Sequence, residues 1–239
     1  MNNVASQAPS TLPSRHVQPS HPQVYRAPHK ALRYELSFLL VRMGAADFTE
    51  PLERDNVIDE LESVLAFCDA HIEHEDAFLR PALLARSAAP VTTLDEEHAE
   101  HATQVAELRS LARTLRESDL PAAQRSLGQT LYLHYSVFVA ETLAHMAYEE
   151  RVVQPLLERL FTPKELLDIH DAILASIPPP EMMRALRSFI PSSNREERAE
   201  ILGGARASMP EDAFAGLLGQ MCALLSFDDA ADLRRRLGL

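Results

Sequence analysis

The residues best suited to chemistry are histidines and glutamates that recur at one spacing. Residues 71–84 and 145–158 share the pattern His-x-x-x-Glu-acid-x-x-x-x-Pro-x-Leu, 74 positions apart. Residues four apart on a helix project from one face, so the His and the Glu of each copy converge. These faces are otherwise apolar, and a buried ionised carboxylate is costly unless a charge compensates it. The repeat therefore predicts a cation between two His-Glu pairs, His71 with Glu75 and His145 with Glu149.

Two further histidines align with apolar helical faces. His29 precedes Leu32 and Leu36, and His98 lies between Leu94 and Val105. Four imidazoles and two carboxylates suit two octahedral irons better than one tetrahedral zinc. If both Glu bridge and an oxo or hydroxo group is added, each iron keeps one open position for a small diatomic. The predicted metal ligands are His29, His71, Glu75, His98, His145 and Glu149.

Other polar residues near this set have undecided roles. His74, His101 and Glu150 are interpreted as additional ligands or as hydrogen-bond partners of ligands. His134 lies eleven residues before His145, roughly 16 Å along a helix, so it is interpreted as a core or channel residue. No catalytic residue is singled out.

Four long amphipathic helices must position these residues. Apolar residues recurring at three and four predict helices over about 28–45, 51–86, 93–117 and 121–160. Thr93 and Glu96 form a capping box that would open the third helix. Short connections favour an all-α, antiparallel up-down-up-down four-helix bundle. In that arrangement the four histidines lie at one level.

The chain divides into three parts by composition. Residues 1–27 are rich in Pro and Ser and are interpreted as a flexible arm. Residues 28–161 form the bundle. Residues 162–239 form a C-terminal helical extension, expected to pack on the bundle or on a partner subunit. Its short helices are predicted over about 163–176, 181–190, 195–206, 210–224 and 227–237.

The composition excludes several classes of protein. With 46% apolar and 24% charged residues the chain has the composition of a globular protein. Its net charge of −12 disfavours binding to the phosphate backbone of nucleic acid. No apolar run approaches the roughly 18 residues of a membrane span, and no secretory signal is recognisable. The two cysteines are interpreted as small buried hydrophobic residues in a reducing compartment. We expect a cytoplasmic protein.

The ligand pattern resembles the hemerythrin-like HHE cation-binding family. The resemblance covers about residues 28–160 and includes the phrase Glu-Glu-x-x-x-x-Pro-x-Leu after the last ligand pair. It implies an antiparallel four-helix bundle with a non-haem di-iron centre. Oxygen-carrying hemerythrins have His-x-x-x-His in the third helix and a later Asp, whereas position 102 here is Ala and His101 is the nearest substitute. The four-His, two-Glu set is similar to di-iron proteins that repair iron centres under nitrosative stress, but their short Cys-bearing N-terminal domain is not found here.

Three functions remain open from the sequence. The first is a protein that holds two iron ions, or other divalent metals, and binds or senses O₂, NO or peroxide, or buffers iron. The second is a di-iron oxidase or a peroxide- or NO-processing enzyme, because an open iron position is chemically competent. The third is a regulatory module whose metal state changes contacts of residues 162–239, with a second copy or a partner protein.

Overall fold

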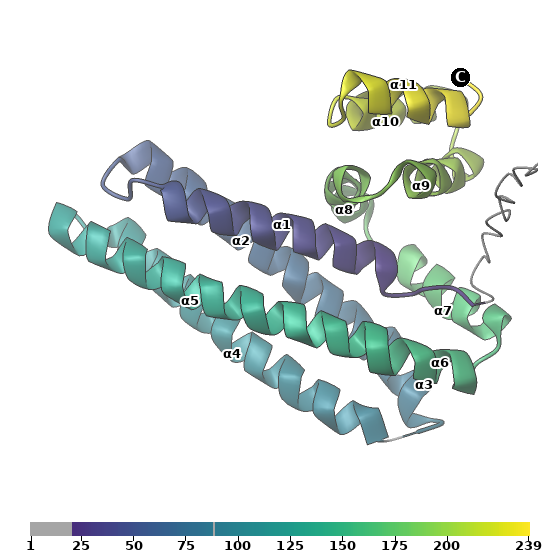
Figure 1. The fold of residues 1–239 in the computed structure, drawn as a ribbon, viewed down its shortest axis with the longest axis horizontal. Helices are drawn as coiled ribbons and strands as arrows, with labels where there is room; N and C mark the ends of the chain where they lie inside the picture. The colour runs from purple at the N-terminus through teal and green to yellow at the C-terminus, as the bar shows by residue number, and fades with distance from the viewer. Residues whose placement is uncertain (1–20, 88) are drawn as a thin grey trace, which may run out of the picture.

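The computed structural model describes residues 21–87 and 89–239, and this part of the chain is helical with no strand. Four long helices lie side by side and run in alternating directions (Figure 1). The prediction of an all-α four-helix bundle is confirmed. The four helices are α1 Arg26–Ala45, α2 Pro51–His74, α4 Ala89–Glu117 and α5 Pro121–Tyr148.

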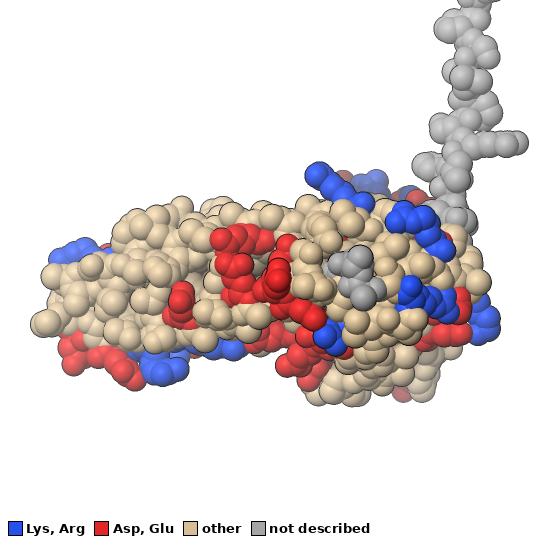
Figure 2. Space-filling model, turned by 90° about the horizontal axis from the view of Figure 1, so that it is seen from below, with Lys and Arg blue, Asp and Glu red and all other residues tan. Residues whose placement is uncertain are grey.

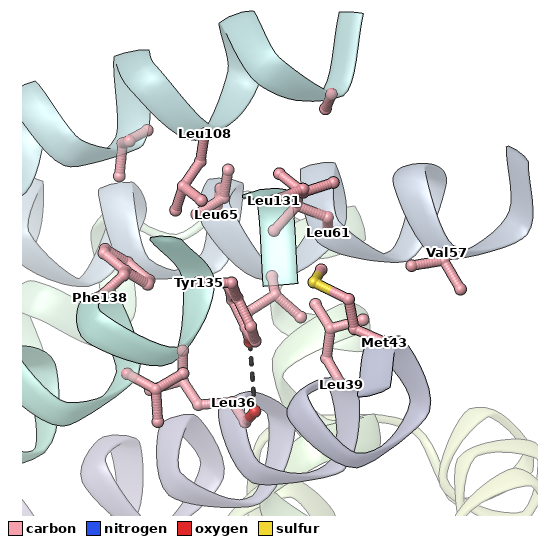
Figure 3. Close-up of a cluster of buried hydrophobic side chains, with 14 of the residues drawn as sticks. Leu36, Leu39, Met43, Val57, Leu61, Leu65, Leu108, Leu131, Tyr135 and Phe138 are labelled. Carbon is pink, nitrogen blue, oxygen red and sulfur yellow. Dashed lines mark hydrogen bonds between the residues drawn. The ribbon is translucent and has the colours of Figure 1, made fainter. Parts of the chain in front are cut away.

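Aliphatic side chains at helical spacing fill the middle of the bundle (Figure 3). All four helices contribute to this core, in which the Tyr135 ring is fully buried. Its hydroxyl donates to the carbonyl of Leu36 at 3.2 Å, so the one polar atom of the ring has a partner. The core holds the helices in register on one side of the predicted ligands. Its largest members include Leu36, Leu39, Met43, Leu61, Leu65, Leu108 and Phe138.

The two repeat copies share a backbone irregularity that the sequence does not reveal. After α2 and α5 the chain makes π-helical turns, η1 Glu75–Leu79 and η2 Glu149–Val153. It then returns to α-helix in α3 Arg80–Leu84 and α6 Gln154–Leu160. The second residue of each of these helices is proline, which lacks the N–H that α-helical bonding needs. The structure has a widened turn just before each proline.

The third long helix begins earlier than predicted. The capping box at Thr93 and Glu96 is wrong, because α4 already starts at Ala89 and Thr93 lies inside it. Pro90 falls in the first turn, where a helix needs no N–H from its residues. This proline, rather than the Thr-Glu pair, suits the start of the helix.

Residues 162–239 fold into short helices close to those predicted. Capping boxes open α7 at Thr162 and α9 at Asn194, and Ser226 caps α11. The extension has a hydrophobic core of its own, yet it also packs on the bundle, α8 on α1 and α7 on η1. The boundary at residue 162 remains a prediction. The helices are α7 Pro163–Ser176, α8 Pro179–Ser192, α9 Arg195–Ser208, α10 Glu211–Cys222 and α11 Phe227–Arg236.

The segment before α1 is attached to the bundle rather than free. Most of the predicted flexible arm, residues 1–20, lies outside the described residues. Tyr25, however, is only 2% exposed. The backbone N–H of Val24 donates a hydrogen bond to Oε1 of Gln154 at 3.2 Å. Gln23 also donates to Glu158 at 2.7 Å. Residues 23–25 of the predicted arm therefore pack on the bundle, and Tyr25 lies in an apolar cluster. The boundary at residue 27 remains a prediction.

None of the helices described, residues 88 and 1–20 being left aside, is both long and apolar enough to cross a membrane.

Candidate metal centre

The six predicted ligands lie together near one end of the four-helix bundle. They form two overlapping groups, and within each group one donor atom per residue lies within 4.8 Å of the others. Both groups share Glu75 and Glu149. The helical hairpin of α1 and α2 supplies the histidines of one group, and that of α4 and α5 supplies those of the other. The groups are His29, His71, Glu75 and Glu149, and Glu75, His98, His145 and Glu149.

Each carboxylate contacts one histidine from each hairpin. Glu75 Oε1 lies 3.1 Å from His71 Nε2, and its Oε2 lies 3.6 Å from His98 Nε2. Glu149 Oε2 lies 3.1 Å from His29 Nε2 and 3.4 Å from His145 Nε2. Both carboxylates therefore lie between the two His pairs and are shared by both groups.

The inward-facing atoms of this cluster are buried without hydrogen-bond partners. This holds for the Nε2 atoms of the four histidines and for all four carboxylate oxygens. An unpaired buried polar atom costs about 1–3 kcal/mol, and more when the group is charged. Among the described side chains only Nη1 of Arg184 and Nε2 of His101 share this condition. Eight such atoms converge on one place, where a bound cation would give them the partners that the protein does not supply.

Burial shifts the protonation of the cluster in the absence of metal. Desolvation raises the pKa of Glu149 to about 8, and it raises that of Glu75 well above its usual range. Desolvation also lowers the pKa of His29 to about 3, so its imidazole is neutral at pH 7. Neutral imidazoles are the form that binds metal, and a cation would favour the ionised form of both carboxylates.

Three of the four histidines have a carboxylate on the opposite ring nitrogen. Such a partner fixes the tautomer, with Nδ1 protonated and Nε2 free to bind metal, and makes the ring a stronger ligand. Among the described residues, His71 has no carboxylate at this position. The three pairs are His29 with Glu150 at 3.0 Å, His98 with Asp76 at 3.0 Å and His145 with Glu97 at 2.7 Å.

Of these partners the sequence predicts Glu150 best. It was interpreted as a ligand or a ligand's partner, and in the structure it contacts His29 while Arg33 donates to both its oxygens at 2.6 and 3.0 Å. Glu97 was not predicted, because its contact is with His145 on another helix and no spacing within α4 reveals it. Tyr25 was not predicted either, yet its ring stacks on His29 at 5.1 Å between centroids.

The remaining histidines lie outside both groups. His74 is half-buried, and His101 packs on the Phe138 ring at 4.9 Å. Burial lowers the pKa of His101 to about 4, so this ring is also neutral. His134 is exposed, which contradicts the interpretation as a core or channel residue.

The surface next to the α4–α5 histidines is acidic. A hollow of about 200 Å³ is lined by Glu97, Glu100 and Glu141 together with His101 and His145. The helix α4 lies lowest in Figure 1, and the view from below shows Asp and Glu gathered near the middle of that face (Figure 2). Such a field raises the local concentration of cations.

Comparison with known protein families gives a match. The model of the hemerythrin HHE cation binding domain matches residues 89–215, just over half of the chain. The matched segment includes His98, His145 and Glu149 and continues into the extension. A comparison with curated proteins finds no match.

Proposed function

Because the chain belongs to the hemerythrin HHE cation-binding domain family, we propose that it holds two iron ions between α1, α2, α4 and α5. The family and the His/Glu cluster together support a metal-binding protein. The proposed role is to bind or sense a small ligand such as O₂, NO or peroxide, or to buffer iron. The observation that carries the proposal is the position of Glu75 and Glu149, buried and shared by both histidine pairs.

The proposed assignment gives each iron two histidines and a share of both carboxylates. His29 and His71 would hold one ion, and His98 and His145 the other. Bound iron would supply a Lewis-acidic, redox-active centre with a coordination position left free for a small ligand. The same donor set can take other divalent metals, because selectivity depends on metal availability as well as on geometry.

The surrounding residues orient the ligands and limit water. The carboxylates on Nδ1 hold three imidazoles with Nε2 inward, and Arg33 in turn holds Glu150. Tyr25 covers His29, which is itself fully buried. In such a low-dielectric site, interactions between charges are stronger than in water, so the ligands keep their places without reorganisation.

The experiment is iron reconstitution of the full chain under anaerobic conditions, followed by metal analysis and optical spectra. We expect two irons per chain, falling to one or fewer in His145→Ala. The matched control is His134→Ala, which removes an exposed histidine from the same helix and should keep both irons. A ratio of one or zero in the wild type would disprove the two-iron assignment.

The same preparation separates binding from turnover. Reversible spectral changes on adding O₂ or NO, without net consumption, would agree with a binding or sensing role. Sustained consumption of peroxide or NO would instead favour the enzymatic alternative.

A further inference from the structure

A cavity of about 510 Å³ lies between the bundle and the extension. One wall is α2 with η1, and the opposite wall is α7 with one face of α8. Residues 23–25 and the first turn of α1, with Ala27 and Pro28, close it from the side. The cavity therefore exists only because the extension packs on the bundle.

The cavity reaches the candidate metal centre. His71 and Glu75 line it, and each belongs to the ligand set described above. Tyr25, which stacks on His29, lines it as well. A molecule bound here would therefore lie beside the α1–α2 side of the centre. The α4–α5 side faces the separate acidic hollow.

The size and lining of the cavity exceed what a diatomic needs. A water-sized guest requires only about 10–15 Å³, whereas pockets of about 300–1,000 Å³ hold organic ligands. Most of the lining is aliphatic or aromatic and comes from both walls. Its larger apolar members are Val24, Phe67, Leu79, Ile173, Ile177 and Phe189.

The charges around the cavity disfavour an anion. Glu73 and Glu181 are exposed lining residues, and Asp69 forms an ion pair with Arg109 at 2.9 Å. Arg184 is the one cationic lining side chain among the described residues, histidines aside. Its Nε and Nη2 donate to Ser63 and its guanidinium stacks on the Phe67 ring at 4.7 Å.

From these observations we infer that the cavity binds one uncharged, mainly apolar organic molecule, of one or two aromatic rings in size, next to His71 and Glu75. The inference rests on the proposed function, because the bound molecule would contact His71 and Glu75 of the proposed metal centre. It assigns the extension a role, which is to build the outer wall of this binding site.

The test uses two probes with the same ring system and different charge. Binding of 2-naphthalenemethanol and of 2-naphthoate to the full chain is measured by titration calorimetry at pH 7, with metal-free and with zinc-loaded protein. We expect one 2-naphthalenemethanol per chain and at least tenfold weaker binding of 2-naphthoate. In the zinc-loaded protein, the neutral probe should shift the NMR signals of the Tyr25 and His71 rings.

Two variants locate the binding site. Ile173→Trp fills the cavity from the extension and should weaken binding at least tenfold. Leu167→Trp is the matched control, because it makes a similar change on an exposed, non-lining position of the same helix, and it should bind normally. If Ile173→Trp fails to fold by circular dichroism, Ala66→Phe fills the cavity from α2 instead.

The outcomes separate this inference from the proposed function. Wild-type protein with two irons but no probe binding would overturn the cavity assignment alone. Probe binding that Ile173→Trp or Ala66→Phe abolishes would support the cavity, even if fewer than two irons were found. Tighter binding of 2-naphthoate would indicate the partnerless Nη1 of Arg184 as an anion anchor and would overturn the assignment of an uncharged ligand.

Discussion

At the residue scale, Glu75 and Glu149 are buried acids, and desolvation makes their ionised forms costly in the metal-free fold. Their oxygens are buried without hydrogen-bond partners, and each carboxylate contacts a histidine from both helical hairpins. Without metal their ionised forms destabilise the folded state, whereas the two proposed cations would link the halves of the centre through them. The same side chains should therefore oppose folding in the metal-free protein and support it in the loaded one.

The first prediction concerns Glu75→Ala. Losing a shared ligand should reduce iron from two per chain to one that is loosely held. The metal-free variant should be at least as stable as wild type, because a buried unpaired carboxylate is gone. Metal analysis and chemical unfolding check both results.

Glu107→Ala, at an exposed position of α4, is the control and should change neither quantity. Glu150→Ala should not be neutral, because Glu150 contacts His29 and Arg33. It should weaken iron binding less than Glu75→Ala does. Two tightly coupled irons in Glu75→Ala would contradict the shared-ligand assignment.

The second prediction is a pH dependence of the metal-free protein. The pKa of Glu149 is raised from 4.5 to about 8, so its folded form keeps a proton that the unfolded chain releases. Its contribution to stability is full below pH 4.5 and is lost as the pH rises through about 8. His29 acts in the opposite window, since its pKa is lowered from 6.5 to about 3 and stability is lost as the pH falls below 6.5.

Thermal unfolding of metal-free protein should therefore show a Tm that declines from about pH 6 to about pH 9. Glu149→Gln should flatten this decline. Iron-loaded wild type should also lack it, because a cation keeps the carboxylate ionised. An equal decline in wild type and variant would show that Glu149 does not titrate as assigned.

The sequence predicts the residues of the cluster better than their surroundings. The His-x-x-x-Glu repeat marks both halves of the set, because one helical face carries both members of each pair. His29 and His98 follow from alignment with apolar faces. Glu97 and Tyr25 could not be found in this way, since each acts on a histidine of a different element. That the four histidines and two glutamates of the cluster bind metal remains a prediction.

At the element scale, each helix that carries a Glu of the cluster widens at that Glu. The carbonyls of Glu75 and Glu149 accept from the N–H five residues later, at Arg80 and Gln154. Such π turns are frequent at functional sites. The sequence shows the prolines at 81 and 155 but not the response of the backbone, because a kink and a π turn both accommodate a missing N–H. The start of α4 was misplaced since a capping pattern is a weaker signal than a proline in the first turn.

The third prediction concerns the far end of the bundle. Gly128 on α5 lies directly against Phe48, and a Cβ added there would overlap the ring. Gly128→Ala should lower the free energy of unfolding by about 1–3 kcal/mol, because overpacking outweighs the gain in helix propensity. Chemical unfolding measures the change, and iron content should stay at the wild-type value.

Gly216→Ala in α10 is the matched control. Nothing lies within 4 Å of the position of its Cβ, so the substitution should stabilise the protein by about 0.5–1 kcal/mol. Equal effects of the two substitutions would mean that α5 does not approach Phe48 as closely as described.

At the scale of the whole molecule, the extension holds the helix that carries His29. Lys30, the next residue, donates to both oxygens of Glu197 on α9 at 2.7 Å. About two turns further along α1, the carboxylate of Glu35 accepts a hydrogen bond from the hydroxyl of Ser188 on α8. None of this packing could be predicted from the sequence, because the helices of the extension could equally cover a partner subunit. The cavity was unpredictable for the same reason.

The fourth prediction tests the regulatory alternative. If metal fixes His29, then α1 becomes less mobile and the helices packed on it should be protected as well. Hydrogen exchange of α8 and α9 should slow at least twofold on iron loading. The helices α10 and α11, which have no comparable contact with α1, are the internal control. Unchanged exchange in α8 and α9 would argue against transmission to the extension.

The carboxylates on the outer ring nitrogens would make the two proposed metal positions unequal. Both histidines of the α4–α5 position have such a partner, whereas His71 of the other position has none among the described residues. Better electron donation and the acidic hollow nearby should let the α4–α5 position fill first. At one equivalent of metal the protein would then be a singly occupied species with a defined vacancy. Adding a different ion next would give a heterobimetallic centre, in which each metal could be followed by its own spectroscopic signal.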